Sequence, residues 1–530
     1  MTSPPAAAAP DSAVRPTPVY RRKLFWVALL YFSEGLPLGV FFDIFPVYFR
    51  QQGVNLADIG LLSLLGLSWT VKFLWAPAID WARHHRLWVS AANAGMACVM
   101  WFFAAGSAGG GAFAFGPWVW VAIGLFTVLS ATNDIATDGY TIELLDRDEY
   151  GMANGFRIGF YRVGMLFAGV VLMLSGWYGW SLAYVLGGAV FAANALMALF
   201  APREQLRVST NTSLATEMAL LREQPLWIAA LALVLIGLLW PALAPLAKVM
   251  GWSAVALWNQ TWWFKGLIPV GLMFLGAGLM VTAANHPRAQ LMREGPVFGA
   301  WVELLSRPGM IAILIFILLF KLGDAAMGFM VKPFWVDSGF SNQQIGLVSV
   351  NLGLALSIGG GLLGGWYVDT RGIYKGLWVL GIWQAVSNLG YAAAAYYVPK
   401  VAAGGEVALV HQLMVYSASA LESFTGGLGT GAFLAFLMAI TSRAKATTEY
   451  AILSSIFAFS RAVAGWAGGI GAQELGYATY FFLTFWLCFP AYALLPQVRA
   501  MLSRANGDAP VEPAAASASG APTETAPAHP

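Results

Sequence analysis

The stretch from Gly309 to Pro333, GMIAILIFILLFKLGDAAMGFMVKP, decides what kind of fold this chain adopts. It exceeds the roughly 20 residues that an α-helix needs to cross the hydrocarbon core of a bilayer. Apart from Lys332 near its end, its charged residues are Lys321 and Asp324. A charge near the bilayer centre costs about 2.5 to 3.5 kcal/mol on insertion scales, so such residues face a polar interior. The stretch therefore predicts a membrane helix with one polar side.

The composition extends this prediction to the whole chain. Of the 530 residues, 59% are hydrophobic and only 10% are charged, and the mean hydropathy is +0.67. These values lie far from those of a soluble globular protein. About fourteen apolar runs are long enough to span a bilayer, and none alternates apolar and polar residues as a β-barrel strand would. We therefore expect an all-α integral membrane protein.

The expected helices fall into two sets of six with two more between them. The first set is 24–50, 57–80, 87–107, 115–143, 150–175 and 179–200, and the second is 309–333, 344–368, 376–397, 412–441, 449–473 and 477–497. The inserted pair is 226–247 and 262–284. The corresponding domains are a disordered tail 1–19, a bundle 20–201, a linker 202–308 with the inserted pair, a bundle 309–498 and a disordered tail 499–530.

Lysine and arginine predict the orientation, because positive charges are retained on the cytoplasmic side of a membrane. Most of them fall in loops on the side of the two termini. The opposite segments receive only Arg50, Lys248, Lys332 and Lys400. Both termini are therefore predicted to be cytoplasmic. The net charge of +3 follows from this distribution, and no basic patch indicates nucleic-acid binding.

A weak parallel repeat relates the two sets of six helices. Ile59-Gly60-Leu61 follows Gly53 at the spacing at which Ile345-Gly346-Leu347 follows Gly339. Asp80 with Arg83, and Asp369 with Arg371, come at the inner ends of the second and eighth helices, where they are predicted to act in gating or in structural pairing. Glu149-Tyr150 precedes Arg162 as Glu449-Tyr450 precedes Arg461. Offsets of 286 to 300 residues predict two six-helix halves in the same orientation.

Charged residues also recur at mid-bilayer depth in both halves. Acids fall in the first, fourth, seventh and tenth core helices (Glu34, Asp134, Asp324 and Glu422), and arginines in the fifth and eleventh (Arg162 and Arg461). Asp138 lies four residues after Asp134, on the same helix face. Such a set indicates a polar cavity of the kind that moves a polar solute across a membrane.

Each candidate has a functional and a structural interpretation. Glu34, Asp134, Asp138 and Glu422 are candidates for proton coupling, since burial favours the neutral form of an acid. Candidates for substrate binding or for lining the cavity are Tyr161, Arg162, Asp324, Gln384, Asn388 and Arg461. Arginine suits carboxylate because its planar fork donates two parallel hydrogen bonds. The alternative is that these charges form ion pairs between helices: Asp134 or Asp138 with Arg157 or Arg162, Lys321 with Asp324, and Lys72 with an acid of the fourth or eleventh helix.

Ordered motifs in at least eight of the helices resemble those of one known family. They are EGLPL at 34–38, KFLWAP at 72–77, NDI at 133–135, YRVGML at 161–166, KLGD at 321–324, SNLGY at 387–391 and AILS at 451–454. With these the chain resembles the AmpG-type muropeptide permeases of the major facilitator superfamily, which are related to acetyl-CoA transporters. Asn133, where glutamine is frequent in the family, and the inserted helix pair depart from that pattern.

The resemblance implies a major facilitator fold with two six-helix bundles. It also implies proton-driven import of cell-wall muropeptides across the bacterial inner membrane, with no cofactor besides the proton gradient. A monomer in the lipid bilayer is expected to suffice. Two other functions are considered: the same mechanism with an acyl-CoA-like or other anionic cargo, and a membrane-embedded enzyme. Four of the five histidines lie in loops or in the tail, which disfavours the enzyme.

Overall fold

The chain is built from helices in the computed structural model. The structure describes residues 23–72, 75, 76, 79, 84–108, 116–144, 150–203, 219–249, 251, 262–287, 289, 293, 298–401, 405–441 and 446–505. No strand occurs among them. In this part of the chain, eleven helices are long and apolar enough to cross a membrane. The predicted all-α membrane fold is confirmed.

The first six helices form one bundle. Its first helix is continuous through α1 (Lys23–Gly39), η2 (Val40–Ile44) and α2 (Phe45–Gln51), and its second through α3 (Leu56–Leu62), η3 (Ser63–Gly66) and α4 (Leu67–Val71). The next four are α6 (His85–Ser107), α7 (Pro117–Leu144), α8 (Tyr150–Tyr178) and α9 (Trp180–Leu199).

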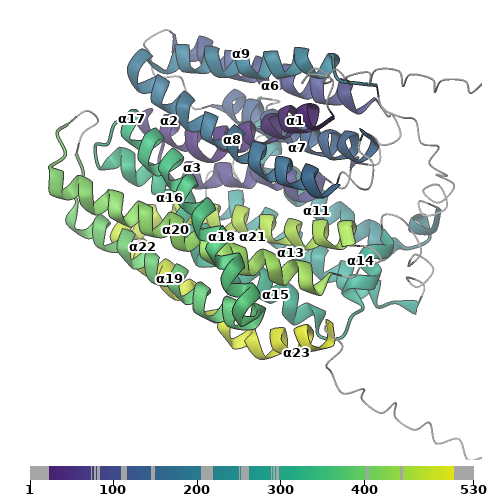
Figure 1. Ribbon diagram of the computed structural model, residues 1–530. Coiled ribbons are helices and arrows are strands. Elements are labelled where there is room, and N and C mark those ends of the chain that lie inside the picture. The colour runs from purple at the N-terminus through teal and green to yellow at the C-terminus, as the bar shows by residue number, and fades with distance from the viewer. Residues whose placement is uncertain are drawn as a thin grey trace, which may run out of the picture.

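The last six helices form the second bundle. Helix seven comprises α15 (Met310–Phe320) and α16 (Leu322–Asp337), and helix eight comprises α17 (Asn342–Gln344), η6 (Ile345–Leu352) and α18 (Gly353–Arg371). Helices nine to eleven are α19 (Ile373–Tyr397), α20 (Leu409–Ile440) and α21 (Ala446–Leu475). Helix twelve runs through α22 (Tyr477–Leu487), η8 (Phe489–Leu494) and α23 (Leu495–Ala505). Figure 1 shows the first bundle in purple and blue against the second in green and yellow.

Every one of the fourteen predicted ranges falls on a helix. Two of these helices contain apolar stretches shorter than a full span, at Leu56–Val71 and Pro225–Gly237. The range 376–397 corresponds to α19, which has 25 residues but is less apolar than the eleven spans. A helix of that length still crosses the hydrocarbon core.

Two helices are irregular next to the predicted charged positions. Pro37 lies inside α1 and lacks the N–H that a regular turn needs, and the π-helical turns of η2 begin three residues later. Helix seven is interrupted at Lys321, which ends α15 and precedes α16. Interruptions of this kind expose backbone groups and are frequent at functional sites.

The two bundles touch along two seams, and the repeated glycines lie in them. A Cβ atom added to Gly60 of α3 would come 2.6 Å from the Cα atom of Gly469 in α21. One added to Gly346 of η6 would come 2.7 Å from the carbonyl oxygen of Gly169 in α8. Helix two thus packs backbone to backbone on helix eleven, and helix eight on helix five. The repeat places equivalent glycines at equivalent contacts.

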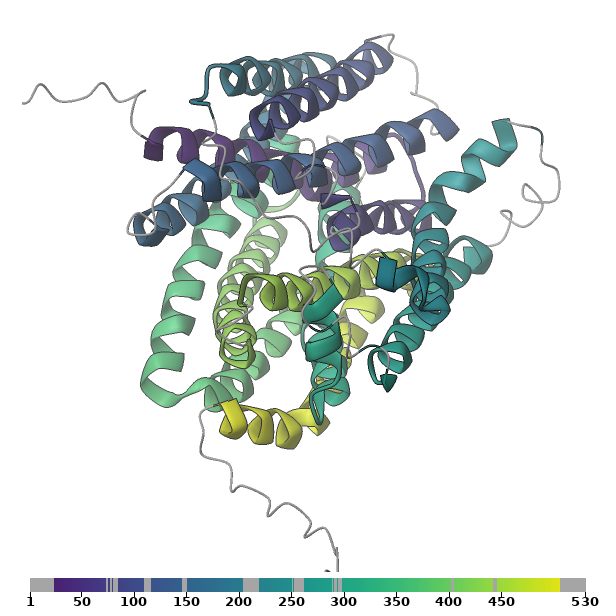
Figure 2. The same ribbon diagram turned by 90° about the vertical axis from the view of Figure 1, so that its right-hand side faces the viewer.

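The inserted segment contributes α11 (Pro225–Val249), α13 (Trp262–Ala284) and α14 (Phe298–Leu305). Their buried side chains share one apolar cluster with helix two and helix eleven, including Trp227 and Met273 from the insert, Leu64 from helix two and Trp466 from helix eleven. Figure 2 shows this teal segment at the side of the two bundles. The inserted helices therefore cover the seam between helices two and eleven.

Candidate functional site

Charged side chains of the first bundle converge between helices one, two, four and five. Lys72, at the end of α4, forms an ion pair with Asp134 of α7. One helical turn further along α7, Asp138 accepts a hydrogen bond from the Tyr31 hydroxyl at 2.8 Å and lies 3.2 Å from Arg157 of α8. We call Lys72, Asp134, Asp138, Arg157 and the adjacent Glu34 the first charged group. The two predicted acids of helix four therefore share a face but have different partners.

Among the described residues, Glu34 is the member of this group that forms no ion pair. It is buried in α1, and its Oε2 atom has no hydrogen-bond partner among the described residues. It interacts electrostatically with Asp134 and Asp138. A buried acid beside other acids is stabilised by taking up a proton.

A second charged group lies at the interruption of helix seven. The Lys321 ammonium is 3.2 Å from Asp324 and donates to Thr430 Oγ1 at 2.8 Å and to the Gly426 carbonyl at 3.3 Å. Lys321 thus ties helix seven to helix ten, and the predicted Lys321–Asp324 pair is present. Glu422, one turn before Gly426 on α20, interacts electrostatically with Asp324.

Arg461 connects the two halves. Its guanidinium carbon lies 3.8 Å from the centre of the Phe42 ring, which belongs to helix one of the other half. Tyr161 of α8 interacts electrostatically both with Arg461 and with Glu34. Arg461 and Tyr161 therefore lie between the two charged groups.

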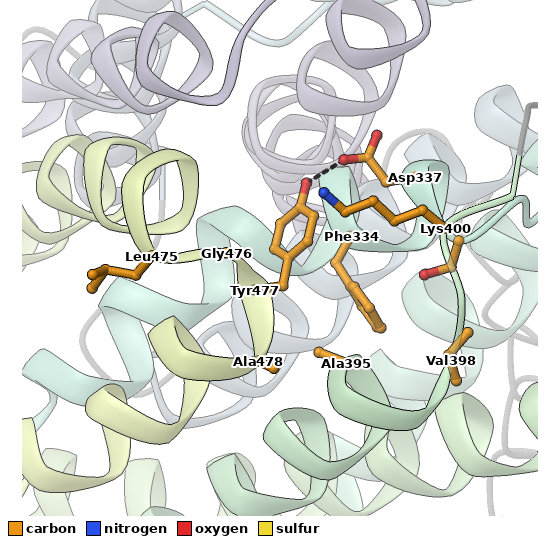
Figure 3. A pocket seen from close by; sticks show the side chains of 10 residues that line it. Phe334, Asp337, Ala395, Val398, Lys400, Leu475, Gly476, Tyr477 and Ala478 are labelled. Carbon is orange, nitrogen blue, oxygen red and sulfur yellow. Dashed lines mark hydrogen bonds between the residues drawn. The ribbon is translucent and has the colours of Figure 1, made fainter.

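An ion pair joins the halves at one end of the molecule. Arg50, at the end of α2, binds Asp337, at the end of α16, through Nε at 2.6 Å and Nη2 at 2.7 Å. The Tyr477 hydroxyl donates to the same carboxylate at 2.8 Å, and the Lys400 ammonium lies over the Tyr477 ring. Figure 3 shows Asp337, Tyr477 and Lys400 together at the pocket beside this contact. We call Arg50, Asp337 and Tyr477 the end cluster.

A second ion pair joins the halves nearer the middle. Lys332 of α16 lies 3.3 Å from Asp43 of η2 and donates to Ser349 Oγ of η6 at 2.6 Å. The predicted range of helix seven, 309–333, ends four residues too early. Helix seven extends to Asp337, so Lys332 lies more than a turn inside it and is buried.

The remaining candidates are distributed over the molecule. Arg162 is half-buried on α8, and Arg157 rather than Arg162 binds the helix-four acid. Gln384 is buried on α19 beside Gly429, and Asn388 donates to Thr484 Oγ1 at 3.2 Å. Both therefore lie in the packing of α19 against α20 and α22, and the structure does not bring them to the charged groups.

The predicted pairs at the inner ends of helices two and eight are only partly covered by the structure. Asp369 and Arg371 are exposed at the end of α18. Asp80, Arg83 and Glu149 lie outside the described residues. Glu449, the second copy of Glu149, is fully buried and binds Arg307 at 2.5 Å.

The partnership of Arg50 with Asp337 was not predicted, although the sequence carries a signal for it. The two residues are 287 positions apart, one more than the 286 of the glycine repeat. They therefore occupy equivalent helix ends with opposite charge. In two parallel repeats related by an axis along the membrane normal, such ends can meet.

Comparisons with known proteins agree with this architecture. No family model matches the chain. The anhydromuropeptide permease of Escherichia coli is 24% identical over 478 residues, which cover 88% of this chain and 78% of the permease. A putative transporter AmpG 4 of Rickettsia conorii is 22% identical over 89% of this chain and 95% of its own length.

Solved structures show the same fold. PepTSo, a POT family transporter, superposes with a TM-score of 0.61 at 11% identity, covering 93% of this chain and all of PepTSo. An autoinhibited POT family peptide transporter gives a TM-score of 0.60 at 14% identity, covering 91% of this chain and 97% of its own.

The fold defines the class: a multi-pass membrane protein with the major facilitator fold of secondary transporters. More particularly, the chain is a homologue of the AmpG-type permeases, with 21 to 24% identity over about 90% of its length.

Proposed function

We propose that this protein imports anhydromuropeptides across the bacterial inner membrane together with protons, by alternating access. The observation that carries the proposal is the position of the contacts between the halves. Arg50–Asp337, Asp43–Lys332 and a hydrogen bond of 2.7 Å from Gln51 to Asn342 join helix one to helices seven and eight between the middle and one end. Hydrogen bonds from Asn342 to Ser175 and from the Ala57 amide to Gln473 lie at the same end.

These contacts close one end of the path between the bundles. With both termini cytoplasmic, as the lysine and arginine distribution predicts, the closed end is periplasmic. Import then requires the halves to rock until the residues of the end cluster separate. The two charged groups then become accessible from the periplasm. Major facilitator transporters use such rocking of parallel repeats around a central site.

Proton coupling is assigned to Glu34 and Asp134. Asp134 forms an ion pair with Lys72. Glu34 forms no ion pair among the described residues and interacts with Asp134. A proton taken up on this pair removes one negative charge from the first charged group. The group then carries the positive charges of Lys72 and Arg157 against fewer acids, which favours an anionic cargo.

The proposed cargo is suggested by relatives that are named anhydromuropeptide permeases. An anhydromuropeptide combines sugar rings with carboxylates. Arg461 lies beside Phe42 and interacts electrostatically with Tyr161, so this region combines a positive charge with aromatic faces. Aromatic faces suit the sugar rings, and the arginine fork suits the carboxylates.

Uptake by proteoliposomes tests the proposal. We expect labelled anhydromuropeptide to accumulate when an inward proton gradient is imposed, and we expect Asp134→Asn to abolish that gradient-driven accumulation. Glu474→Gln, which neutralises an exposed acid at the end of α21, is the matched control and should transport normally. Uptake indifferent to the gradient would contradict the coupling. Uptake of acyl-CoA in place of anhydromuropeptide would contradict the cargo.

A further inference from the structure

Arg461 is held in one place by contacts on both sides of it. The preceding residue, Ser460, donates a hydrogen bond to the Leu318 carbonyl of helix seven at 2.5 Å. The carbonyl of the following residue, Ala462, accepts one from Ser63 of helix two at 2.6 Å. This turn of α21 is thus fixed between the two halves, and it directs Arg461 onto the Phe42 ring.

The acids that surround Arg461 are bound to other cations. Asp43 and Asp324 both interact electrostatically with Arg461. However, Asp43 is paired with Lys332 at 3.3 Å and Asp324 with Lys321 at 3.2 Å. Within the described residues, no ion pair joins Arg461 to a carboxylate, and its side chain is exposed although it lies well inside α21. The edge of its guanidinium is available to an external acceptor.

An aromatic wall stands next to this cation. The Phe42 ring stacks on Trp69 at 6.2 Å between ring centres and at 27°, and Phe329 meets Phe42 edge-on at 6.0 Å. The Trp69 indole N–H donates to Ser130 Oγ at 3.2 Å, which fixes the orientation of the ring. Trp69 is only half-buried, so part of its ring remains accessible.

We propose that Arg461, Phe42 and Trp69 form a carboxylate-binding subsite that selects organic acids carrying a ring. The Phe42 face covers one side of the guanidinium by a cation–π contact and leaves the planar fork free for two parallel hydrogen bonds. Trp69 supplies a flat surface for the ring. This inference rests on the proposed transport function and specifies which part of the cargo is recognised.

The subsite also explains how a cargo would favour one conformation. Arg461 belongs to helix eleven, whereas Phe42 and Trp69 belong to helices one and two of the other half. An acid that contacts the guanidinium and the aromatic wall together spans both halves. It binds tightly only while they are close, so it stabilises the conformation in which the subsite is assembled.

Binding to the purified full-length protein in detergent tests the subsite. The probes are N-acetylmuramic acid, its methyl ester and N-acetylglucosamine, measured by calorimetry. We expect the acid to bind about 10- to 100-fold more tightly than the ester, the range of a hydrogen bond to a charged group. Arg461→Gln should remove this preference, and Arg461→Lys should restore only part of it, because lysine lacks the fork. Arg499→Gln removes an exposed arginine that also lies over a ring, that of Tyr374, and should change nothing.

The outcomes separate this inference from the proposed function. Equal affinities for acid and ester in the wild-type protein, or an unchanged preference in folded Arg461→Gln, would overturn the subsite even if anhydromuropeptide is imported. A preference for the acid that depends on Arg461 would support the subsite even if anhydromuropeptide is not the cargo. Trp69→Leu provides a second variant, and we expect it to weaken the binding of N-acetylmuramic acid and of its methyl ester about equally.

Discussion

At the scale of single residues, the two buried acids of helix four depend on partners from other helices. Asp134 is held by Lys72 of helix two, and Asp138 by Arg157 and the Tyr31 hydroxyl. The spacing of Asp134 and Asp138 predicts that they share one face of helix four, and in the structure they do. Their partners could not be assigned from sequence, because spacing within one helix does not determine how neighbouring helices are rotated against it.

A double-mutant cycle on Lys72 and Asp134 tests this dependence. Lys72→Met should destabilise the protein because it leaves Asp134 charged and without its partner. Adding Asp134→Leu should recover part of the loss, since a pair of apolar side chains tolerates burial. We expect a coupling energy on the order of 1 to 3 kcal/mol, measured by unfolding in detergent. Additive effects of the two changes would contradict a direct pair.

At the scale of elements, the repeated glycines position the bundles. Gly60 and Gly346 occur in the same motif of the two halves, and each lies where a second backbone passes directly against it. The motif was detected as a repeat. Its role in packing became visible only with the partner helices in place, because a glycine in sequence does not show what approaches it.

A pair of alanine substitutions in helix eight tests this packing. In Gly346→Ala the new methyl group would meet the Gly169 carbonyl and Met173, so we expect a loss of about 1 to 3 kcal/mol. Gly359→Ala adds the same group where nothing lies within 4 Å of it. That control should be neutral or should stabilise by up to about 1 kcal/mol, because alanine favours helix more than glycine does. Equal melting temperatures for the two variants would exclude the seam contact.

The fold was largely predictable from the sequence, whereas the site was predictable only in part. Apolar runs of bilayer length fix the helices, and the acids predicted in helices one, four, seven and ten are the acidic members of the two charged groups. The interruption of helix seven at Lys321 was not foreseen. Hydropathy averages over a whole helix and does not register such local breaks. Gln384 and Asn388 were polar residues in apolar helices, but their partners lie within one bundle.

At the scale of the whole molecule, opposite charges on helices one and seven bring the bundles together at one end. Arg50 meets Asp337, and Asp43 meets Lys332, in each case from helix one to helix seven. The Arg50–Asp337 pair is partly exposed, since its side chains keep 22% and 14% exposure. Ion pairs of this type contribute modestly to stability and can separate at low cost, which suits a contact that opens in every cycle.

Crosslinking of the end cluster during transport tests the central claim most directly. Arg50→Cys and Asp337→Cys would be introduced after replacing the native Cys98 and Cys488 with serine, joined through reducible disulfides by a short bis-methanethiosulfonate, and assayed for anhydromuropeptide uptake. Alternating access predicts that uptake falls at least about tenfold in the crosslinked protein and returns when the same sample is reduced. Undiminished uptake in fully crosslinked protein would contradict the account, because the end of the path would then not need to open.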